Sequence, residues 1–136
     1  MIRTVLLIAL GTTAAQADGF CDDIVQLQSQ ATITMPTTPS RQASCTAGQG
    51  LGGTAFVHCA IDFDFRAPAA LEALEVITDA LVSCPQTSRE DFTDQKVNHP
   101  DSYTLRKFTQ GAHEISLSLK DKGALQKTYV FLRVDN

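Results

Sequence analysis

The stretch TAFVHCAIDFDF (residues 54–65), followed closely by PAALEALEVITDALVSC (residues 68–84), sets the fold class. From position 57 onward, apolar residues at odd positions alternate with small or polar residues at even positions, which predicts a strand with one buried face. In the second segment apolar residues recur at helical spacing. Pro68 suits the first helical position, and Pro85 follows its end. We therefore expect a strand that leads directly into a helix.

The other elements are recognised by the same two periodicities. They are a helix at 20–30 and strands at 43–46, 103–108, 114–119 and 127–134. Short connections separate the last three strands, which favours an antiparallel meander. The sequence thus predicts an α+β fold in the order α-β-β-α-β-β-β, a disulfide-stabilised antiparallel sheet of about five strands with two helices on one face.

Three local features complete the predicted layout. Asp18 is the expected N-cap of the first helix. Residues 32–44, rich in Thr, Ser and Pro, are expected to form an extended connection, and the polar residues 86–101 a surface loop. The glycines at 48–53 lie between two predicted strands and are expected to form a hairpin loop.

The predicted core comprises the apolar faces of these elements, with one face of the last strand. Its members are Phe20, Ile24, Leu27, Val57, Ile61, Phe63, Leu71, Leu74, Ile77, Leu81, Ile115, Leu117 and Leu119.

Composition narrows the class of protein. The chain has 136 residues, a net charge of −4 and 43% hydrophobic residues, which fits one folded domain and excludes a disordered chain. An acidic balance disfavours a nucleic-acid partner, because phosphate neutralisation needs a basic face.

Residues 1–17 have the pattern of a secretory signal peptide. Arg3 supplies the positive charge, residues 5–10 the apolar segment, and Ala15-Gln16-Ala17 the cleavage site. We expect cleavage after Ala17 and a single mature α+β domain at 18–136 that is periplasmic or secreted, with no membrane span, since the apolar run is far shorter than the roughly 18 residues a span needs.

All four cysteines lie in the expected mature part, where an even count predicts disulfides. The strand from Phe65 back to Cys59 would be about 20 Å long, and the helix from Pro68 forward to Cys84 about 24 Å long. A helix that runs back along the strand would therefore bring Cys59 level with Cys84. That geometry favours Cys59–Cys84 with Cys21–Cys45. The rival pairing, Cys45–Cys59 across the first hairpin with Cys21–Cys84, stays open.

Few residues form a pattern that indicates chemistry. His58, Asp62 and Asp64 share the wetter face of one predicted strand, and Arg66 follows, so together they form a candidate surface patch. His58 and Asp62 would lie about 13 Å apart in a strand, too far for one metal ion to bind both. His99 lies in a predicted loop. No metal, cofactor or catalytic set is assigned.

Two functional hypotheses follow. The first is an exported, non-catalytic binding, inhibitor or accessory protein whose protein partner carries a basic patch that suits the acidic chain. The alternative is a small metal-dependent or acid–base hydrolase that uses His58, Asp62 and Asp64 or the His99 loop.

Overall fold

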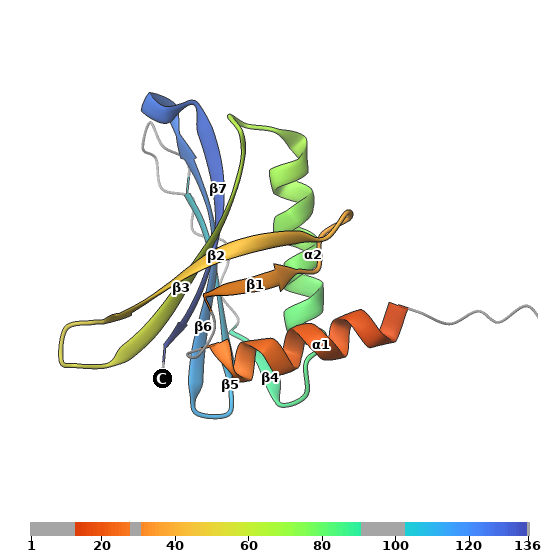
Figure 1. Ribbon diagram of the computed structural model, residues 1–136, viewed down its shortest axis with the longest axis vertical. Coiled ribbons are helices and arrows are strands. Elements are labelled where there is room, and N and C mark those ends of the chain that lie inside the picture. Colours follow the sequence, from red (N-terminus) through yellow and green to blue (C-terminus); the bar gives the residue numbers. More distant parts are fainter. Residues whose placement is uncertain (1–12, 28–30, 91–102, 136) are drawn as a thin grey trace, which may run out of the picture.

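The computed structural model describes residues 13–27, 31–90 and 103–135. Two helices and seven strands make up this part of the chain (Figure 1). They are α1 (Thr13–Val25), β1 (Thr32–Met35), β2 (Arg41–Gln49), β3 (Ala55–Asp64), α2 (Pro68–Ser83), β4 (Thr87–Arg89), β5 (Tyr103–Gln110), β6 (His113–Lys122) and β7 (Lys127–Asp135), with a 3-10 turn, η2, at Gly123–Leu125.

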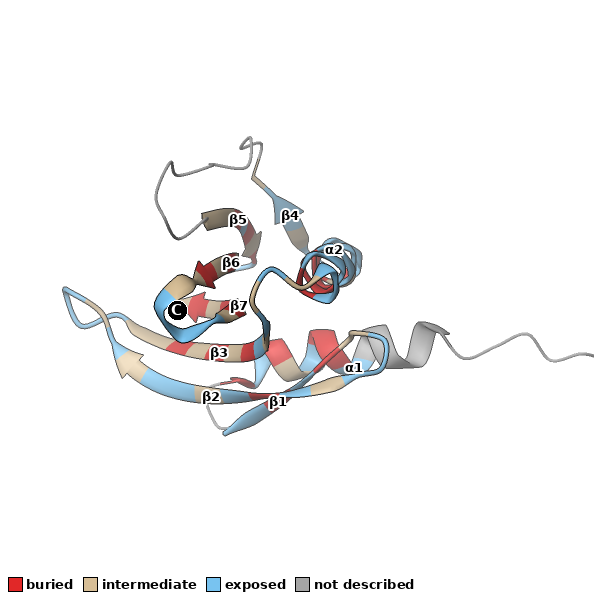
Figure 2. Cartoon of the chain, turned by 90° about the horizontal axis from the view of Figure 1, so that it is seen from above, coloured by how far each residue is buried: buried red, intermediate tan, exposed pale blue. Residues whose placement is uncertain are grey.

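The strands form one antiparallel sheet in the order β1-β2-β3-β7-β6-β5-β4. The sheet curves into a half-barrel, and α2 lies in its hollow, where it contacts β3, β4, β6 and β7 (Figure 2). Helix α1 packs against α2 and β1. The predicted α+β class with two disulfides is confirmed, but the prediction of about five strands is wrong, because β1 and β4 extend the sheet at its two edges.

Both missed strands lie in segments expected to be irregular. In β1, Ile33 and Met35 are buried while Thr32 and Thr34 face solvent, so the segment alternates over only four residues. Strand β4 is three residues long and pairs with the end of β5. The remainder of the expected loop, residues 91–101 with His99, lies outside the described residues.

The inner face of the sheet and the two helices enclose the core. Eleven of the thirteen predicted core residues are buried, and Phe63 is half-buried against them. The exception is Leu71, which is 58% exposed. The buried arc of α2 is centred instead on Leu74, Ile77 and Leu81, with the small Ala70 and Ala73 beside them. Leu71 lies just outside that arc on the helix surface, and its side chain is therefore exposed to solvent.

The first helix starts earlier than expected. Helix α1 begins at Thr13 and ends at Val25, so Asp18 lies inside the helix rather than at its N-cap. Phe20, Ile24 and Leu27 are buried, as predicted. Residues 1–12 of the predicted signal segment lie outside the described residues. Within the described part, no helix is long and apolar enough to cross a membrane.

The favoured disulfide pairing is wrong, and the structure has the rival one. Cys45 of β2 and Cys59 of β3 are direct cross-strand partners with Cα atoms 4.0 Å apart, and Cys21 of α1 is joined to Cys84 at the end of α2. The expected pairing assumed that α2 runs back alongside β3. Instead α2 lies across several strands, and its C-terminal end meets α1.

Candidate binding site on a projecting hairpin

The hairpin between β2 and β3 extends beyond the rest of the sheet in both overall views (Figures 1 and 2). We call its distal part, residues 46–56, the arm. None of its residues is buried, whereas Cys59 and Val57 just beyond it belong to the core. The arm is therefore solvated on both faces, unlike the central strands.

The arm has a local chemical reason to form a tight turn. Gly52 and Gly53 adopt φ values of +89° and +82°, which side-chain-bearing residues rarely adopt. The Gly53 N–H donates to the Gly50 carbonyl at 3.1 Å, and the Gly50 N–H donates to the Thr54 carbonyl at 2.8 Å. This turn holds Leu51 at the tip, where its side chain is fully exposed.

Two contacts brace the base of the arm. The Cys45–Cys59 disulfide joins its two strands. On the outer face the Phe56 ring lies over Gly48, so closely that a Cβ added at Gly48 would come within 2.6 Å of the ring. The Arg133 guanidinium stacks on the same ring, 4.0 Å from its centroid. A braced arm loses less conformational entropy on binding than a loose loop.

One edge of the arm carries main-chain groups that no described strand pairs. Strand β1 pairs with β2 only as far as Ser44, and the Cys45 N–H donates to the Ala31 carbonyl at 2.8 Å. Main-chain groups alternate in direction along an antiparallel strand. The main-chain N–H of Cys45 points away from β3. The main-chain groups of Ala47 and Gln49 therefore point away from β3 as well, toward solvent.

Soluble proteins usually protect such an edge with charged residues or proline. Here the protection is missing, since residues 42–61 contain no Asp, Glu, Lys, Arg or Pro. This uncharged run was visible in the sequence. The glycines drew attention to the turn instead, and only the structure places residues 46–49 of this run on an edge that no described strand pairs.

A cleft of about 560 Å³ lies between the arm and the β5–β6 turn. Its lining residues are Gly50, Leu51, Thr54, Ala112, Glu114, Arg133 and Asp135. Arg133 pairs with Asp135, with Nη2 2.7 Å from Oδ1 and Nε 2.9 Å from Oδ2. The cleft thus presents the exposed carboxylate of Glu114 beside the apolar tip, whereas the carboxylate of Asp135 is paired with Arg133.

The predicted surface patch is placed on the same outer face, farther along β3. His58 packs on Phe131, with ring centroids 4.8 Å apart. Burial, and to a lesser extent the charge of Arg133, lower the pKa of His58 below 6.5. His58 is therefore held as a neutral aromatic contact at neutral pH.

The other members of the patch form ion pairs with residues outside it. The Lys127 ammonium lies 3.3 Å from Asp62 and 3.9 Å from Asp64. Arg66 turns instead to the buried carboxylate of Asp121, at 3.3 Å. No cluster of three or more His, Cys, Asp or Glu side chains suited to a metal ion occurs in the described parts of the chain. The structure does not gather the four patch residues around a common point.

Comparison with protein-family models, with curated proteins and with solved structures finds no match to this chain.

Proposed function

We propose that the chain is an exported, non-catalytic binding protein that docks onto a partner protein through its arm. The observation that carries the proposal is an uncharged, unpaired strand edge with a fully exposed leucine at its tip, Leu51. An edge strand recognises a partner by adding a strand, and a side chain at its end can fill a pocket. The hydrolase alternative has no comparable support among the described residues.

The energetics favour docking at this place. Transfer of one leucine side chain from water into an apolar pocket contributes about 1.5–3 kcal/mol. Ala47 and Gln49 would add main-chain hydrogen bonds along the edge. The disulfide and the Phe56 contact keep the arm in shape before binding, which lowers the cost of ordering it.

The partner is expected to present an apolar pocket, a free strand edge and basic side chains near them. Glu114 borders the arm, and the chain as a whole is acidic, so basic groups on the partner would face opposite charge. The signal-like residues 1–17 and the two disulfides support export to the periplasm or beyond the cell.

The test uses a matched pair of exposed leucines. Leu51 lies at the arm tip, and Leu125, 62% exposed, lies in the turn before β7. The exported protein, checked by intact mass to begin at Asp18, is used to capture its partner from an extract of the source compartment. We expect Leu51→Ala to weaken the affinity for the captured protein about tenfold to a hundredfold, and Leu125→Ala to leave it unchanged.

Three results would overturn the proposal. One is equal binding by the two variants, and another is the absence of any captured protein. The third is self-association of the chain that depends on Leu51, which would make the partner a second copy.

A further inference from the structure

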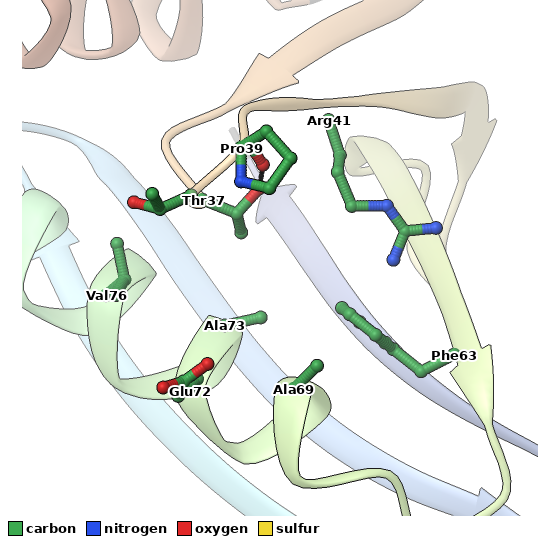
Figure 3. Close-up of a pocket in the computed structure, with 9 residues that line it drawn as sticks. Thr37, Pro39, Arg41, Phe63, Ala69, Glu72, Ala73 and Val76 are labelled. Carbon is green, nitrogen blue, oxygen red and sulfur yellow. Dashed lines mark hydrogen bonds between the residues drawn. The ribbon is translucent and has the colours of Figure 1, made fainter.

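A pocket of about 500 Å³ lies at the opposite end of β2 from the arm (Figure 3). It is enclosed by the β1–β2 turn, the end of β3 and one side of α2. Its lining residues are Thr37, Thr38, Pro39, Arg41, Phe63, Ala69, Glu72, Ala73 and Val76. The volume is in the range of sites that hold small organic molecules.

The walls of this pocket are mainly apolar. The Phe63 ring forms one side, Ala69 and Ala73 of α2 lie across from it, and Val76 lines the pocket farther along the helix (Figure 3). The two alanines keep the helix surface low at this point, which leaves room between α2 and the sheet. Thr37 is already engaged, because its hydroxyl donates to the Pro39 carbonyl at 2.9 Å.

Arg41 is the cationic side chain in the lining. Its guanidinium carbon lies over the Phe63 ring, 4.5 Å from the centroid, so the charged group rests on the apolar wall. Arg66, Arg106 and Arg133 each pair with a carboxylate. Arg41 forms no such ion pair with any residue that the structure describes, and its hydrogen-bond donors are available to a ligand.

The pocket therefore combines one oriented guanidinium with an apolar cavity. A guanidinium binds a carboxylate through two parallel hydrogen bonds. Glu72 also borders the pocket but forms no ion pair with Arg41. Its negative charge opposes a doubly charged anion such as a phosphate monoester more strongly than a singly charged one. The electrostatics favour a monocarboxylate.

We propose that this pocket binds a monocarboxylate with an aliphatic or aromatic body, whose carboxylate pairs with Arg41 while the body packs between Phe63 and α2. The site is separate from the arm, and the proposal does not depend on the docking function.

Calorimetric titration tests the site with hexanoate and 4-phenylbutanoate, and with 1-hexanol as the uncharged comparison. The disulfide-bonded protein is expected to bind both carboxylates and to bind the alcohol at least tenfold more weakly. Arg41→Gln should weaken carboxylate binding at least tenfold. Glu72→Gln should strengthen it a few-fold, because a repelling charge is removed.

The matched control is Lys107→Gln, which removes a positive charge from an exposed position on β5. It is expected to leave carboxylate binding unchanged, and thermal unfolding of each variant confirms that the fold is retained. Equal binding by Arg41→Gln and the unchanged protein would overturn the proposal. So would failure of the unchanged protein to bind either carboxylate, or equal binding of hexanoate and 1-hexanol.

Discussion

Two leucines one helical turn apart on α2 provide a sharp test of the core. Leu74 is 2% exposed and belongs to the main hydrophobic cluster, whereas Leu71 is 58% exposed. Both substitutions, Leu74→Ala and Leu71→Ala, remove the same atoms from the same helix. The difference between their effects therefore reports burial rather than helix propensity.

The expected magnitudes are well separated. Truncation of a buried leucine removes its transfer free energy and leaves a cavity, so Leu74→Ala should cost about 2–5 kcal/mol. Leu71→Ala leaves no cavity and should cost under about 0.5 kcal/mol. The larger loss is a substantial share of the roughly 5–15 kcal/mol that stabilises a domain.

Urea denaturation with both disulfides intact measures the difference. With a slope of about 1.5 kcal/mol/M, a loss of about 3 kcal/mol lowers the midpoint by about 2 M. The Leu71→Ala midpoint should stay within about 0.3 M of the unchanged protein. Equal midpoints for the two variants, or a larger loss for Leu71→Ala, would refute the packing of α2 described above.

The disulfides and His58 give two further predictions. Each disulfide stabilises the fold because it lowers the entropy of the unfolded chain, and a longer closed loop gives a larger effect. The expected stabilisation is about 4 kcal/mol for Cys21–Cys84, with a sequence separation of 63, and about 3 kcal/mol for Cys45–Cys59, with a separation of 14. Replacing the first pair with serine should therefore lower the unfolding midpoint more, and the reverse order would contradict this. The pKa of His58 is lowered in the folded state, so the folded protein binds that proton less tightly than the unfolded chain, and the free energy of unfolding should decline as the pH falls below 6.5. His58→Gln should remove that part of the decline, and identical pH profiles would show that His58 does not cause it.

Alternation in the sequence was sufficient to identify the inner faces of β3 and β6. For β7 it predicted one buried face without deciding which, and the structure buries Thr128, Val130, Leu132 and Val134. The two edge strands were missed because three or four residues are too few to establish a period. In β1 the alternation of threonine with Ile33 and Met35 was also masked by the Pro-rich residues that follow it.

Tertiary geometry decided the rest. The disulfide pairing depends on the direction in which α2 crosses the sheet, which no local pattern encodes. The exposure of Leu71 depends on which arc of α2 faces the sheet. Arg41 lies at the start of β2, far in sequence from Phe63, and only the closed hairpin brings the two side chains together.

The central claim is that a partner protein adds to the free edge of the arm. Amide hydrogen exchange of the disulfide-bonded protein, alone and with its captured partner, tests this most directly. The account predicts that the outward-facing amides of Ala47 and Gln49 exchange rapidly in the free protein and become protected in the complex, while amides on the exposed side of α2 do not change. Protection on α2 or on the outer face around His58, with Ala47 and Gln49 still exchanging rapidly, would contradict it.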